Sequence, residues 1–66
     1  MKIITRCAAN IKADTATLER NASILAGLTI LQPNTEAALS TIKRMRNYMK
    51  TLECNLRVVE SILNSN

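Results

Sequence analysis

The chain has two cysteines and no histidine, and this composition limits the chemistry that it could perform. Cys7 and Cys54 are too few to supply the four thiolates of a structural zinc site, and the usual imidazole ligands are missing. The commonest nucleophilic and acid–base sites also depend on an imidazole. We therefore expect no metal, no cofactor and no enzymatic activity.

The acidic residues and the single glycine indicate no catalytic or phosphate-binding site either. The acids are spread along the chain at positions typical of solvated helix surfaces: Asp14, Glu19, Glu36, Glu53 and Glu60. A phosphate-binding loop needs several glycines, whereas Gly27 is the only one in this sequence.

The stretch "TIKRMRNYMK" concentrates positive charge in a chain whose net charge is +4. Its basic residues are Lys43, Arg44, Arg46 and Lys50. They could contact nucleic acid, but on a helix they spread around the outer half of the cylinder, and Tyr48 is the only aromatic residue available for stacking. The solvated outer face of a coiled coil is the preferred interpretation, with nucleic-acid contact as the alternative.

The elements that would position these residues are set by the only proline. Pro33 cannot donate a backbone hydrogen bond and disfavours helical geometry at Gln32, so a helix should end there. Asn34 or Thr35 can cap the next helix, and Glu36 suits its positive end.

After this break, apolar residues alternate steps of four and three, the spacing of a coiled coil. This predicted seam comprises Ala38, Ile42, Met45, Met49, Leu52, Leu56, Val59 and Leu63. The flexible side chains of Met45 and Met49 would fit a core or an adaptable groove. The mixture of Ile, Met, Leu and Val does not select one oligomer number.

The first half of the chain repeats this pattern with smaller residues. Large residues recur every seven positions, at Ile4, Ile11, Leu18 and Leu25. Small residues follow each by four, at Ala8, Thr15, Ala22 and Thr29, and would allow tight antiparallel packing. Gly27 weakens a helix, but we expect helical structure to continue to about residue 31.

The predicted fold is all-α: a single antiparallel two-helix hairpin over residues 1–66, coiled-coil-like and completed by oligomerisation or a partner helix. Helix 1 spans about 3–31, the turn about 32–34 and helix 2 about 35–63. An opened, domain-swapped rod would keep nearly the same contacts. Cys7 and Cys54 should fall at different levels of the hairpin and remain free thiols, with Cys7 in the core.

Apolar residues beside the seam predict the interaction surface, since they would leave hydrophobic area for a partner to cover. The predicted interface residues are Ile24, Leu31, Tyr48, Val58 and Ile62. The expected partner is a second copy of the chain or a helical protein client.

The plan of a helix, a Pro-Asn turn and a second helix within 66 residues resembles the small subunits and needle chaperones of type III secretion systems. It also resembles small coiled-coil subunits of other assemblies, including viral ones. The resemblance implies a chaperone, adaptor or assembly subunit and assigns no individual residue.

The segment after Lys2 has too few apolar residues for a secretory signal, and the apolar run at 24–31 is too short to span a bilayer. A cytoplasmic location is expected, although a protein secreted without a leader would have the same features. The sequence thus predicts a non-enzymatic helical interaction module; the alternative is a small basic nucleic-acid-binding regulator.

Overall fold

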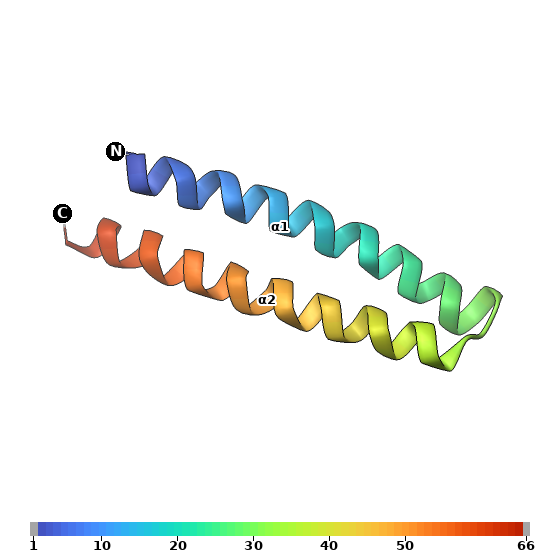
Figure 1. Cartoon of the computed structure of the whole chain (residues 1–66). Coiled ribbons are helices and arrows are strands. Elements are labelled where there is room, and N and C mark those ends of the chain that lie inside the picture. The colour runs from blue at the N-terminus through green and yellow to red at the C-terminus, as the bar shows by residue number, and fades with distance from the viewer. Residues whose placement is uncertain (1, 66) are drawn as a thin grey trace.

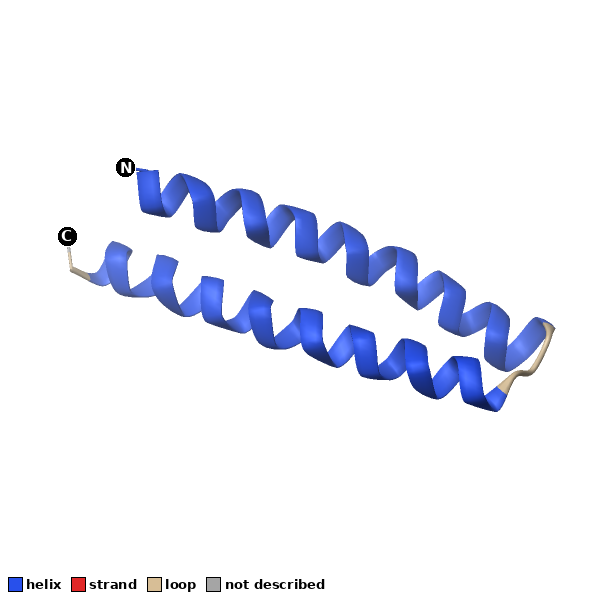
Figure 2. Cartoon of the chain, in the orientation of Figure 1, coloured by secondary structure: helices blue, strands red, loops and turns tan. Residues whose placement is uncertain are grey.

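A computed structural model describes residues 2–65 as two long helices joined by a tight connection. Helix α1 spans Lys2–Ala26 and helix α2 spans Thr35–Asn64. They run antiparallel and lie side by side along their whole length, so the start of α1 and the end of α2 lie far from the turn (Figures 1 and 2). The predicted all-α hairpin is confirmed, and it forms a thin rod measuring 49 × 14 × 14 Å.

The first helix does not stop at its glycine but changes geometry there. Gly27–Leu31 forms a single π-helical turn, η1, in which the amide of Gln32 donates to the carbonyl of Gly27 at 2.9 Å. The amide of Asn34 then donates to the carbonyl of Leu28 at 2.8 Å. These two bonds occupy carbonyl groups at the end of the helix, as the loss of the regular ladder requires.

Helix α2 begins with a side-chain cap. Asn34 has an extended backbone, and its side chain accepts a hydrogen bond from the amide of Ala37 at 3.1 Å. Glu36 places a negative charge in the first turn, where the helix dipole favours it. At the other end, the hydroxyl of Ser65 donates to the carbonyl of Ile62.

The two helices meet along one row of residues on each, which we call the seam. On α1 it comprises Ile4, Cys7, Ile11, Asp14, Leu18, Asn21 and Leu25, and it continues to Leu28 in η1; all of these are buried or half-buried. On α2 it comprises Ala38, Thr41, Met45, Tyr48, Leu52, Asn55, Val59 and Ile62, of which Tyr48 is the most exposed at 37%. Both rows alternate steps of three and four, which is the coiled-coil repeat.

Three polar seam residues donate hydrogen bonds to carbonyl groups of their own helices. The side-chain amides of Asn21 and Asn55 donate to the carbonyls of Thr17 and Thr51, each at 2.9 Å. The hydroxyl of Thr41 donates to the carbonyl of Ala37 at 2.9 Å. Such local bonds let polar side chains enter the seam without a partner on the opposite helix.

The core of the hairpin is small. Among residues 2–65, only Cys7, Ala38 and Thr41 are buried, with exposures of 7%, 6% and 1%. None of the three has a large side chain, so one hairpin buries little apolar volume. Stability from burial alone should therefore be low.

The seam differs from the one expected from the sequence at every second position of α2. Met49, Leu56 and Leu63, expected inside, are 55%, 46% and 59% exposed, and Ile42 is half-buried beside them. On α1, the small residues expected to pack against α2 are likewise exposed: Ala8, Thr15, Ala22 and Thr29.

The difference is a choice between two seven-residue patterns that share Ala38, Met45, Leu52 and Val59. One pattern adds the residue three positions after each shared residue, and the other adds the residue four positions after. Helix α1 packs against the first pattern. The seam of α1 itself contains the polar residues Asp14 and Asn21, so hydrophobicity alone predicts that the neighbouring small residues face α2 instead.

Candidate functional site

The most distinctive surface of the hairpin is an apolar strip that the rest of the chain leaves largely uncovered, which we call the open flank. Its α2 row comprises Ile42, Met49, Leu56 and Leu63. The facing row of small residues comprises Ala8, Thr15 and Ala22 on α1 and Thr29 in η1. Each residue follows a seam residue by four positions, and in an antiparallel pair these positions emerge on the same side. The flank thus sets large residues beside small ones.

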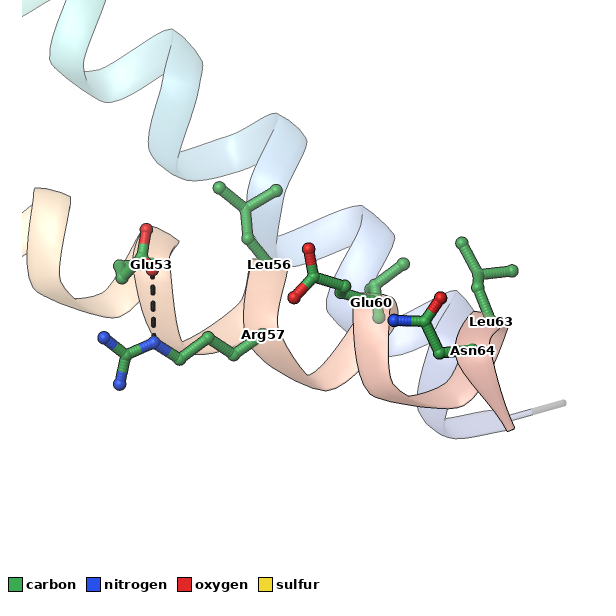
Figure 3. Close-up of a pocket in the computed structure, with 7 residues that line it drawn as sticks. Glu53, Leu56, Arg57, Glu60, Leu63 and Asn64 are labelled. Carbon is green, nitrogen blue, oxygen red and sulfur yellow. Dashed lines mark hydrogen bonds and ion pairs between the residues drawn. The ribbon is translucent and has the colours of Figure 1, made fainter. Parts of the chain in front are cut away.

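The α2 row of the open flank, which we call the large row because of its side chains, runs beside a line of shallow hollows. One hollow is lined by Leu56, Val59 and Leu63 together with Glu53 and Glu60, and Figure 3 shows Leu56 and Leu63 projecting from the same side of the helix. The next hollow is lined by Met49 between Arg46 and Glu53, and a third by Ile42 and Leu39. Aliphatic side chains therefore remain accessible along most of α2.

The facing row of the open flank, which we call the small row because of its side chains, is more apolar than its threonines suggest. The hydroxyl of Thr15 donates to the carbonyl of Ile11 at 2.7 Å, and that of Thr29 donates to the carbonyl of Leu25 at 3.0 Å. Because both hydroxyls already have acceptors, covering them would leave no polar group unsatisfied. A neighbouring helix could pack closely against this row.

Charged side chains of both signs border the open flank. On α1 they are Lys12 and Glu19; on α2 they are Arg46, Glu53 and Glu60. Glu53 accepts a hydrogen bond from Nε of Arg57 at 3.1 Å, with both side chains well exposed (Figure 3). Within residues 2–65 this is the only ion pair, so the charges of Lys12, Glu19, Arg46 and Glu60 have no salt-bridge partner inside the hairpin.

The interface residues predicted from the sequence do not form one surface. Tyr48 and Ile62 lie in the seam. Ile24, Leu31 and Val58 are 50%, 80% and 40% exposed, but the helical repeat places them on the side opposite the open flank. There, polar residues separate them: Asn10, Thr17, Arg44 and Thr51.

The predicted seam residues also divide between two places. The structure puts Ile11, Leu18, Leu25, Met45, Leu52 and Val59 in the seam. It puts Ile42, Met49, Leu56 and Leu63 on the open flank.

The basic residues considered for nucleic-acid binding do not all share a face. Lys43, Arg46 and Lys50 line one hollow on the outer side of α2. Arg44 lies across the helix from them and donates to the hydroxyl of Thr41 at 3.3 Å. Three of the four charges therefore gather along one edge of the open flank.

The remaining reactive groups do not converge. Cys7 is buried, Cys54 is exposed, and both are free thiols. In the part of the chain that the structure describes, no three potential metal ligands lie together. Asp14 stands in the seam with its Oδ2 buried and without a hydrogen-bond partner.

Neither described helix is long and apolar enough to cross a membrane. Comparison with known protein families, with curated proteins and with solved structures finds no match to this chain.

Proposed function

We propose that the chain is a non-enzymatic helical interaction module that associates through its open flank, as an assembly subunit, adaptor or small chaperone. The observation that carries this proposal is the uncovered row of Met49, Leu56 and Leu63 on a hairpin with three small buried residues. A helix that is apolar both at its seam positions and along a row that borders the seam is typical of a bundle with more than two helices.

The surface area of the hairpin supports the same conclusion. The chain exposes 5254 Å², whereas a globular monomer of its mass, 7.3 kDa, is expected to expose about 4,200 Å². The excess of about 1,000 Å² is close to the area of roughly 800 Å² that each partner buries in a standard protein interface. A partner on the open flank would remove this excess.

Sedimentation velocity and circular dichroism, measured over a wide range of protein concentration, test this function. We expect association to accompany helix formation, so the melting temperature should rise with concentration. Met49→Ser with Leu56→Ser should abolish association. Ile24→Ser with Val58→Ser, on the opposite side, provides the matched control and should leave it intact. A monomer that is fully helical and melts cooperatively at a concentration-independent temperature would contradict the proposal, since its flank would need no partner.

A second candidate function rests on the gathering of Lys43, Arg46 and Lys50 along one outer edge of α2. These charges could bind the phosphates of a nucleic acid, and such binding falls steeply with salt. Lack of binding to duplex or single-stranded probes at about 50 mM salt would exclude this candidate. Salt-sensitive binding that Lys43→Ser with Lys50→Ser removes would support it.

A further inference from the structure

We infer that the open flank is covered by a second copy of the same hairpin, in an antiparallel four-helix bundle. The two-fold axis runs parallel to the helices, both turns lie at the same end, and α1 of each copy packs on α2 of the other. This inference rests on the proposed function and specifies its partner. It follows from the area, the shape and the charges of the flank.

The excess exposed area of about 1,000 Å² favours a partner that covers one whole face of the hairpin, because a stable interface buries about 800 Å² on each side. A second hairpin presents a face of the same 49 Å length. It brings both rows with it, so the large row of each copy can cover the small row of the other. Facing large with small residues keeps the helix spacing even.

The heights of the two rows match in this arrangement. In the hairpin, residues equally distant from Pro33 in sequence lie at the same level, which puts Met49 at a level between Thr15 and Ala22. A two-fold axis along the helices preserves these levels. Met49 of the partner subunit therefore faces the gap between Thr15 and Ala22.

The other large residues follow the same rule. Leu56 is level with the gap between Ala8 and Thr15, and Ile42 with the gap between Ala22 and Thr29. Side chains on both helices tilt toward their own N-termini, which brings each large residue closer to the centre of its gap. The result is a knobs-into-holes interface along the bundle.

The bordering charges also match. By the same rule, Lys12 of one copy is level with the partner's Glu53, and Glu19 is level with the partner's Arg46, each within about one helical residue. Both contacts join opposite charges, and each contact occurs twice in the dimer because of the two-fold symmetry. Lys12, Glu19 and Arg46, which lack a salt-bridge partner within one hairpin, thus obtain one between copies.

The alternative two-fold arrangement, with turns at opposite ends, is less complementary. It would pair α2 with the partner's α2 so that Ile42 faces the partner's Leu63 and Met49 faces the partner's Leu56. The axis would then pass beside Glu53 and bring it next to the partner's Glu53. Large residues would face large ones and small ones small ones, which splays the bundle on one side and leaves gaps on the other.

Charge reversal tests the pairing without removing apolar surface. Glu19→Arg or Arg46→Glu alone should weaken the dimer about tenfold at low salt, because each change replaces two attractive contacts with repulsive ones. The double variant should restore the affinity. The matched control is Arg44→Glu, on the opposite side, with little expected effect. Loss of affinity without rescue in the double variant would overturn this pairing.

The distance between the two turns tests the direction of the two-fold axis. Gln32→Cys, in a chain that also carries Cys7→Ala and Cys54→Ser, would take one spin label at each turn. With the turns at the same end, pulsed electron resonance should give a backbone separation of about 10–15 Å, as expected for neighbouring helices in a bundle. A separation close to the 49 Å length of the rod would overturn the arrangement.

The stoichiometry separates failure of this inference from failure of the proposed function. A salt-sensitive dimer that Met49→Ser with Leu56→Ser converts to monomer, by a loss of affinity on the order of a hundredfold, would support both. A poorly helical monomer, or an oligomer larger than a dimer, would overturn the dimer and leave the interaction module standing. A stable, fully helical monomer would overturn both.

Discussion

Oδ1 of Asn34 lies 3.1 Å from the backbone nitrogen of Ala37 and accepts its hydrogen bond, closing the first turn of α2. It is the side-chain cap at the N-terminus of α2. Asn34→Ala should lower the free energy of unfolding by about 1 kcal/mol, whereas Asn34→Asp should retain the cap. Urea unfolding of the three proteins measures the difference, and equal stability of Asn34→Ala and wild type would rule out a stabilising cap.

Gly27 offers a stabilising substitution. Its backbone φ is negative, and an added Cβ would meet no atom within 4 Å beyond the adjacent residues and the backbone of its own helix. Gly27→Ala should therefore raise the free energy of unfolding by about 0.5–1 kcal/mol, because alanine has the higher helix propensity and restricts the unfolded chain. Thermal unfolding at fixed concentration checks this. A lower melting temperature would mean that the π-helical turn depends on glycine.

Asp14 is the least favourable residue in the seam. Its Oδ2 is buried without a hydrogen-bond partner, whereas Asn21 and Asn55 bond to backbone carbonyls of their own helix. Asp14→Leu should stabilise the fold by roughly 1–3 kcal/mol, since it removes an unsatisfied polar group and adds apolar contact. Asp14→Asn, which can copy the bond of Asn21, should stabilise it less. A destabilised Asp14→Leu protein would show that the carboxylate has a partner in the assembled state.

The backbone of this protein was readable from its sequence because local signals determine it. Pro33 ends the first helix, Asn34 caps the second, and continuous seven-residue spacing carries both over their full length. The change of Gly27–Leu31 to π-helical geometry was not predictable, since it depends on how the chain closes the turn.

The choice of seam was not readable, because α2 satisfies two overlapping patterns. Hydrophobicity favours Met49 and Leu56 over Tyr48 and Asn55 at the alternating positions, yet α1 packs on the latter pair. The useful signal was the coexistence of both patterns on one helix, which is typical of a helix with two neighbours. The open flank was therefore encoded in the sequence as a surplus of apolar positions.

The two cysteines should react at different rates. Cys54 is exposed and Cys7 is 7% exposed in the seam, so a thiol reagent under native conditions should modify the first quickly and the second only after opening of the hairpin. Reaction with Ellman's reagent should show one fast and one slow phase, and Cys54→Ser should remove the fast one. A single fast phase for both thiols would mean that the helices separate readily.

Leu52 is the seam residue at which truncation best tests the packing of the two helices, because both seven-residue patterns place it inside. Leu52→Ala should cost roughly 2–5 kcal/mol through lost burial and the cavity left behind. In a chain with so small a core, this loss is enough to unfold it at room temperature. Leu31→Ala removes the same atoms at a site that is 80% exposed and should change stability little. Equal melting temperatures for the two variants in circular dichroism would show that the seam is not the stabilising contact.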